Sequence, residues 1–205
     1  MKRVIIALLF VLLVVGIYWF LFRSHASGPK APKQAPIAQT IHSAPFNNSI
    51  DNVVNAYLQI KDAFVEADST TAKQAARKFL ISLDSVHLAE LKVDSSMIYE
   101  TALGNIGDLK ANTESLLQQT DITEMRKDFS MISELMYPSF LKTVNYEGPK
   151  LYLQNCPMAF NDEVSANWIS SSVEIVNPYL GKNHPKYKSG MLHCGDIKDT
   201  IKANP

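Results

Sequence analysis

The sequence predicts a mainly α protein: an antiparallel four-helix bundle with an irregular, loop-rich C-terminal segment, preceded by one N-terminal transmembrane helix. Three observations predict it. Residues 4–22 carry no charge, apolar residues recur at helical spacing between residues 48 and 144, and this period stops at Gly148. A chain of 205 residues has room for one domain with a core but not for two large ones.

The N-terminal apolar run is long enough to cross a membrane. As a helix, residues 4–22 would extend about 28 Å, close to the roughly 30 Å of a bilayer's hydrocarbon core. Tyr18 and Trp19 near one end fit an interfacial aromatic belt. We therefore expect residues 1–26 to be a signal anchor in the inner membrane, with the remaining chain in the periplasm.

A cleaved signal peptide is the alternative. Lys2 and Arg3 suit its basic start, and cleavage near Ala26 would release the protein into the periplasm. The apolar part of cleavable signals is, however, usually about 7–15 residues, which is shorter than this run.

Charge divides the chain into two parts. The first 45 residues contain five basic and no acidic side chains, whereas the other residues have a net charge of −5. An acidic domain is a poor match for DNA or RNA, so no nucleic acid partner is expected. The basic residues flank the apolar run, where they suit lipid headgroups.

Residues 27–45 are rich in Pro and Ala and predict a tether, because such a segment buries too little apolar surface to offset its ordering entropy. His42 within it is expected to be solvated. Asn48 or Ser49 is then the expected N-cap of the first helix.

The bundle is expected to span residues 46–147. Asp68 or Ser69 is the expected cap of the second helix, and Asp121 has the spacing of a cap for the fourth. Pro138 is expected to disturb the last turn. The four apolar runs are residues 50–64, 72–83, 98–116 and 122–140.

Both cysteines lie in the C-terminal segment, residues 148–205, which we expect to pack on the bundle as part of the same domain. Cys156 begins the block Cys-Pro-Met-Ala-Phe-Asn, and Cys194 follows 38 residues later in Met-Leu-His-Cys-Gly. Pro157 places Cys156 on extended or turn backbone. Between them stand Ala-Asn-Trp and Glu-Ile-Val-Asn-Pro-Tyr.

These blocks, with the helical run at residues 56–65, resemble an uncharacterised bacterial domain over residues 48–198. That domain occurs at the C-terminus of membrane-fusion subunits of copper/silver-type heavy-metal efflux systems and as small exported proteins. The resemblance implies metal handling outside the cytoplasm, with efflux components as partners. This chain departs from the family in a longer loop between Gly181 and Met191, which adds His184; His184 is not carried over as a ligand.

The sulfur and imidazole side chains predict a site for a soft metal ion, Cu(I) before zinc. Two residues apart on extended chain, Cys156 and Met158 would project to one side. Trp168 is expected to be a neighbour that shields the ion. The predicted ligands are Cys156, Met158, Met191, His193 and Cys194.

The alternative is a structural disulfide between Cys156 and Cys194, which is common in exported proteins and excludes a thiolate metal site while it lasts. It would close a loop of about 39 residues and contribute roughly 3–4 kcal/mol. The protein would then be an interaction module, docking on an envelope or efflux partner through an exposed aromatic patch around Trp168 and Tyr179. No catalytic constellation stands out, so an enzyme is not expected.

Overall fold

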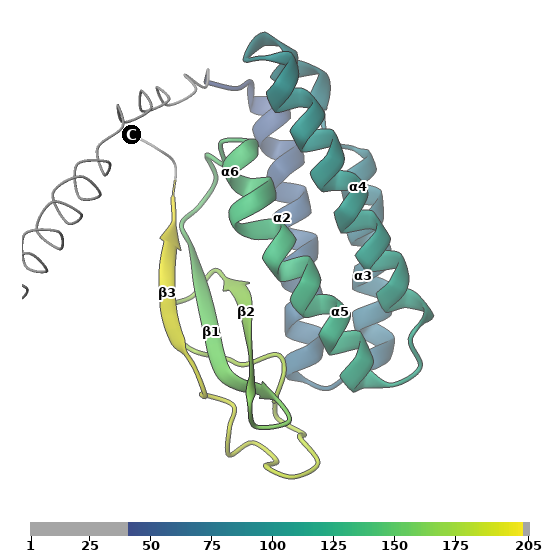
Figure 1. Cartoon of the computed structure of the whole chain (residues 1–205), viewed down its shortest axis with the longest axis vertical. Helices are drawn as coiled ribbons and strands as arrows, with labels where there is room; N and C mark the ends of the chain where they lie inside the picture. Colours follow the sequence, from purple (N-terminus) through teal and green to yellow (C-terminus); the bar gives the residue numbers. More distant parts are fainter. Residues whose placement is uncertain (1–40, 203–205) are drawn as a thin grey trace, which may run out of the picture. The chain divides into compact units, whose positions relative to one another are not determined.

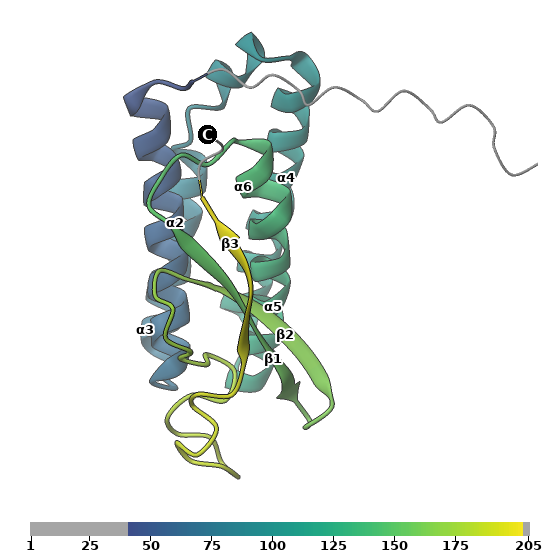
Figure 2. The ribbon, with the colours of Figure 1, turned by 90° about the vertical axis from the view of Figure 1, so that its left-hand side faces the viewer.

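The computed structural model describes residues 41–202, so the predicted transmembrane segment at residues 4–22 lies outside the described range. Within it, four long helices lie side by side and three strands lie along one side of them (Figures 1 and 2). No helix in this part of the chain is both long and apolar enough to span a bilayer. The long helices are α2 (Ala44–Val65), α3 (Ser69–Asp84), α4 (Ser96–Gln118) and α5 (Ile122–Glu134).

Three short elements connect or extend the long helices. The 3-10 helix η1 (Leu88–Val93) lies between α3 and α4. After α5 the chain passes through a π-helical turn, η2 (Leu135–Phe140), into α6 (Leu141–Thr143). The disturbance predicted at Pro138 is confirmed, because the backbone of Tyr137 before it is extended rather than helical.

The four predicted helical runs are confirmed as a bundle, in which helices that are neighbours in sequence pack together. Two predicted caps are also confirmed. Asp68 accepts a hydrogen bond from the Thr71 amide, and Asp121 accepts from the amides of Thr123 and Glu124. Each cap supplies an acceptor for N–H groups that have no partner within the helix.

The start of the first helix was predicted wrongly. It begins at Ala44, inside the segment predicted as tether, and its cap is Ser43 rather than Asn48 or Ser49. The Ser43 hydroxyl accepts from the Phe46 amide at 3.2 Å. Pro45 lies in the first turn, where a missing N–H has no cost, so the proline extends the helix start instead of marking a loop.

His42 is buried, contrary to the expectation that it is solvated. Its ring nitrogens lie 3.6 Å from carboxylate oxygens of Glu90 and Asp94, and its ring packs on Phe46 with centroids 4.4 Å apart. Both hydrogen-bonding groups of Ser43 also donate to Glu90, at 2.6 Å. The residues just before α2 are therefore fastened to η1 and belong to the folded domain.

The C-terminal segment is not simply irregular, which corrects that part of the prediction. It contains three antiparallel strands in the order β2-β1-β3: β1 (Leu151–Phe160), β2 (Val164–Ser170) and β3 (Asp196–Ile201). Pro157 is tolerated because the regular β1–β2 pairing ends at Cys156 and a bulge follows. β3 is an edge strand with mostly exposed side chains, so its sequence lacks an apolar alternation.

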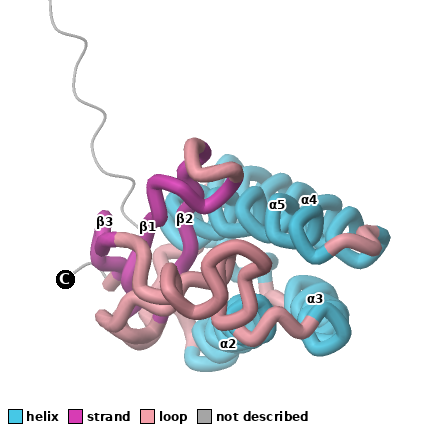
Figure 3. Tube along the Cα trace, turned by 90° about the horizontal axis from the view of Figure 1, so that it is seen from below, coloured by secondary structure: helices cyan, strands magenta, loops and turns pink. Residues whose placement is uncertain are grey.

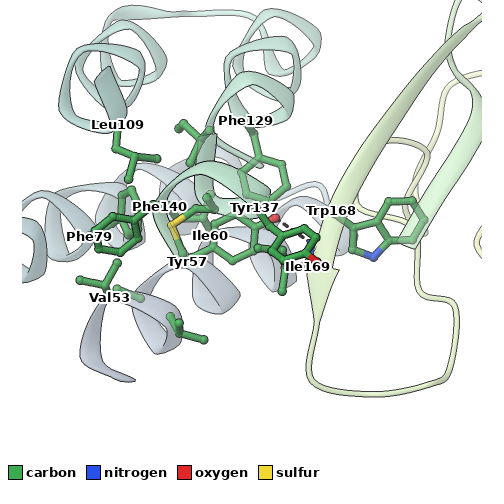
Figure 4. Close-up of a cluster of buried hydrophobic side chains, with 14 of the residues drawn as sticks. Val53, Tyr57, Ile60, Phe79, Leu109, Phe129, Tyr137, Phe140, Trp168 and Ile169 are labelled. Carbon is green, nitrogen blue, oxygen red and sulfur yellow. Dashed lines mark hydrogen bonds between the residues drawn. The ribbon is translucent and has the colours of Figure 1, made fainter. Parts of the chain in front are cut away.

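One face of the sheet lies on the bundle, and a chain of buried hydrogen bonds joins the two. The Ile169 amide of β2 donates to the Tyr57 hydroxyl of α2 at 3.0 Å, which contacts the Ser133 hydroxyl at 2.7 Å. Ser133 donates to the carbonyl of Phe129 on α5, so Tyr57 is the donor to Ser133. Figure 4 shows Ile169 facing this cluster and Trp168 on the other side of β2.

We expect Tyr57→Phe to lower the free energy of unfolding by about 1–3 kcal/mol, because the buried Ile169 amide loses its acceptor. Urea unfolding of the reduced protein measures this. Tyr99→Phe is the control: the Tyr99 hydroxyl has no hydrogen bond within residues 41–202, and a change below about 0.5 kcal/mol is expected. Equal losses in the two variants would contradict the role given to Tyr57.

Candidate functional site

The face of the sheet that points away from the helices is covered by residues 171–195, the segment between β2 and β3, which we call the arm. Figure 3 shows this loop beside the strands and the lower ends of the helices. Gln154 of β1 is fully buried beneath the arm and donates to the carbonyls of Ser172 and Glu174, at 2.9 and 3.1 Å. Its register partner, Trp168, is also fully buried.

The two cysteines meet where the arm returns to the sheet. Cys156 is the next residue after Gln154 on the same face of β1 and is fully buried opposite Ala166. Cys194 lies at the end of the arm and is half-buried. Their sulfur atoms are in direct contact, 2.7 Å apart. The predicted meeting of these two residues, 38 positions apart, is thus confirmed.

Asn177 holds the end of the arm in place and was not predicted as a site residue. It is fully buried, its amide nitrogen Nδ2 donates to the Cys194 carbonyl at 2.9 Å, and its backbone N–H donates to the Leu192 carbonyl at 2.8 Å. Its Oδ1 accepts from the amides of Tyr179 and Leu180. The sequence signal was the Asn-Pro-Tyr turn, since asparagine side chains commonly bond the backbone two residues ahead.

Gly195 allows the backbone next to Cys194 to approach strand β1 closely. Its φ of +144° lies in a region that disfavours other residues, and a Cβ there would be 2.6 Å from the Asn155 carbonyl oxygen. The same Cβ would be 3.0 Å from the Trp168 ring, so this ring lies against the backbone next to Cys194. Any larger residue at position 195 would push Cys194 away from Cys156.

Burial and the neighbouring sulfur favour the protonated form of Cys194. Desolvation, the hydrogen bond to Cys156 and the charges of Cys156 and Asp196 raise the pKa of the Cys194 thiol to about 12. A thiol with so high a pKa is a weak nucleophile at neutral pH. Cys194 is therefore protonated at neutral pH in the absence of a metal ion or an oxidant.

The other three predicted ligands surround the sulfur pair less directly. Met158 lies in the bulged part of β1 and Met191 at a turn of the arm, both half-buried against the core. The bulge interrupts the alternation from which we expected Cys156 and Met158 to share a side. His193 is exposed, with Nδ1 2.7 Å from the Ile175 carbonyl oxygen, so that only Nε2 is left for a ligand.

Within residues 41–202, no three His, Cys, Asp or Glu side chains are grouped as ligands of one ion. The structure thus places two of the five predicted ligands in direct contact. Any metal bound there would depend on sulfur atoms, because carboxylates and further imidazoles do not gather at the pair.

The exposed aromatic patch predicted for docking is absent from this part of the protein. Trp168 has no exposed surface and Tyr179 is only 2 % exposed. Their rings pack edge to face with centroids 5.9 Å apart, and Tyr179 also contacts Phe129 and Phe160. Burial raises the pKa of Tyr179, whose hydroxyl donates to the Asn167 carbonyl. The two aromatics fix the arm to the sheet and the bundle.

The long loop that distinguishes this chain, residues 182–190, does not displace the second cysteine. Asp162, in the turn between β1 and β2, pairs with Lys186 and accepts from the Tyr187 hydroxyl at 2.6 Å. The first residue of the loop is hydrogen-bonded to the end of α2, because the Lys182 amide donates to the Val65 carbonyl at 2.8 Å. The loop is held to the domain at both points, away from Cys194.

Residues 53–147 match the model of a family described as "Protein of unknown function (DUF3347)". This match confirms that the chain resembles an uncharacterised family, and it covers the helices. It ends before β1, so it does not include the two cysteine blocks on which we based the resemblance. No curated protein and no solved structure matches the chain.

We expect Asn177→Asp to weaken the pairing of the cysteines, because it replaces the Nδ2 donor to Cys194 by a buried carboxylate oxygen. The equilibrium constant for closing the disulfide in a glutathione buffer should fall by roughly 10-fold or more, as expected for the loss of a buried hydrogen bond. Asn183→Asp, at an exposed position of the loop, is the control and should leave the constant unchanged. An unchanged constant in Asn177→Asp would remove Asn177 from the site.

Acidification should loosen residues 184–188. The ring nitrogen Nδ1 of His184 accepts from the amides of Lys186 and Tyr187, which requires a neutral imidazole. Burial and the charge of Arg126 lower the pKa of His184 below its ordinary 6.5. The stabilisation is therefore complete above the unfolded-state pKa and is lost as pH falls through the lower folded-state value. Protection factors from hydrogen exchange should fall between about pH 7 and 5, and His184→Ala should abolish this dependence.

Proposed function

We propose that the protein is a membrane-anchored periplasmic domain that binds one soft metal ion, of the Cu(I) class, between Cys156 and Cys194. The observation that carries this proposal is the contact between two cysteine sulfur atoms from distant parts of the chain, 2.7 Å apart. Thiolates are the protein ligands that select Cu(I) over hard cations. Two of them form a donor set without help from carboxylates.

The surroundings of the pair suit such a role. The sulfur of Cys156 is fully buried on β1, and Cys194 is half-buried at the end of the arm. An ion can therefore reach the site from the side of Cys194. The thioethers of Met158 and Met191 and Nε2 of His193 remain the candidates for additional donors. Trp168, against Gly195, would limit access of water to the ion.

Anchoring and export rest on the apolar residues 4–22, and the link to metal efflux rests on the resemblance of the cysteine blocks. Efflux components are accordingly the partners we propose. A tethered domain with a soft-metal site would keep Cu(I) at the membrane surface, where an exporter can receive it. No catalytic step is proposed.

A second function is favoured by a separate observation. Cys156 has no exposed surface, and a fully buried sulfur in contact with a second one is also the arrangement of a structural disulfide. Oxidised, the pair would fasten the arm to β1 and prevent Cu(I) binding. The protein would then be a non-catalytic interaction module that docks on an envelope or efflux partner.

The test is an anaerobic Cu(I) titration of the full chain in detergent, after reduction, against a competing chromophoric chelator. One equivalent should bind and should quench the emission of Trp168, which lies beside the site. Cys156→Ser and Cys194→Ser should each weaken binding by about 100-fold or more, since loss of a ligand removes most of the affinity. Met97→Leu, an exposed methionine outside the arm and sheet, is the control.

Two results decide between the functions. Binding that is absent, or is unchanged in the cysteine variants, would contradict the metal site. A count of free thiols on protein isolated from its own compartment without reductant should give two if the pair binds metal. A count of zero, with unimpaired capture of a partner by the disulfide form, would support the interaction module instead.

A further inference from the structure

One end of the bundle exposes three large aliphatic side chains next to the point where the described chain begins. Ile41 is 91 % exposed, Val93 76 % and Met97 72 %. Ile41 precedes α2, Val93 ends η1, and Met97 lies in the first turn of α4. Figures 1 and 2 show these three segments at the same end of the helices.

Contacts beneath these side chains bring the three segments together. His42, the neighbour of Ile41, lies 3.6 Å from the carboxylate of Asp94, the neighbour of Val93. The Ser95 amide, at the cap of α4, donates to the Leu91 carbonyl of η1 at 3.2 Å. The aliphatic side chains thus belong to one end surface rather than to scattered positions.

The charges at this end do not oppose contact with a lipid headgroup layer. The Asp94 side chain has no exposed surface, and Glu90 is bonded to Ser43 and lies beside His42. Lys92, between them in sequence, is exposed, with its ammonium over the Tyr99 ring at 4.4 Å. Asp94 is thus turned inward and Glu90 only partly, at 29 % side-chain exposure, while Lys92 is exposed, and Glu100 lies one turn beyond Met97; the exposed cation suits anionic lipid.

We infer that this end surface, Ile41, Val93 and Met97 with Lys92, docks on the bilayer in which the chain is anchored. The inference rests on the membrane anchoring proposed above. Only residues 23–40 separate the apolar run from Ile41. A Pro-rich segment of that length spans at most about 55 Å, at roughly 3.1 Å per residue. Within that reach the tether raises the effective concentration of the lipid surface at the domain, which favours contact through the three aliphatic side chains.

The contact gives the cysteine site a defined position. The β1–β2 turn and the arm lie at the opposite end of the molecule from this surface (Figure 1). A domain docked by Ile41, Val93 and Met97 would present Cys194 away from the lipid, toward a partner that projects from the membrane. Docking therefore fixes the direction from which metal is delivered and received.

Photocrosslinking of the full chain in vesicles of phosphatidylethanolamine and phosphatidylglycerol tests the inference. The photoreactive p-benzoylphenylalanine is placed at position 93 or 97, and at 164 as the control. Val164 is 54 % exposed and lies at the β1–β2 turn, at the far end of the domain. Lipid adducts, measured by mass spectrometry, should be at least about fivefold more abundant at positions 93 and 97 than at 164, as tethered contact requires.

Carbonate extraction of the same vesicles separates the failures. A chain that remains in the vesicles but gives equal lipid adducts at positions 93, 97 and 164 overturns the docking inference and leaves the anchor intact. A chain that carbonate removes overturns both. Adducts that join two copies of the chain, in place of lipid adducts, would also overturn docking and assign the surface to self-association.

Discussion

The arrangement of this protein depends on covering both faces of a three-stranded sheet. One face is covered by the bundle, to which the Ile169 amide is joined through Tyr57. The other carries Gln154 and Trp168, which are completely buried although no helix lies over them. The arm folds back over this face because covering the Trp168 indole removes a large apolar surface from water, and the Gln154 amide nitrogen then donates to carbonyls of the arm. The meeting of the cysteines follows from that return.

The arm is held by polar groups that bind backbone as well as by the buried side chains of Tyr179 and Leu180. Asn177 alone engages the backbone of Tyr179, just after it, and of Cys194, at the far end of the arm. Arg126 adds a second fixed point: it is buried, donates to the Phe64 carbonyl at the end of α2 and lies against Gly181. Burial lowers the pKa of Arg126 to about 10. Such contacts define one conformation, so the distance between the sulfur atoms is set by the fold.

The two ends of the domain serve different purposes in this arrangement. At the end with Ser43 and η1 the described chain begins, fastened by His42 between two carboxylates. The opposite end carries the arm and its sulfur pair. The helices of the bundle run between these two ends and set the distance between them.

The sequence alone determined the four helices, because their apolar positions recur with the helical period, and the caps Asp68 and Asp121, because capping depends on residues three positions apart. It also singled out Cys156 and Cys194 as the candidate site residues. Only the tertiary structure decided the sheet, whose edge strand has few apolar residues, and the burial of His42 and Trp168, whose partners are distant in sequence. The burial of such residues depends on contacts with segments that are distant in sequence, and the local periodicity of the sequence does not show which segments these are.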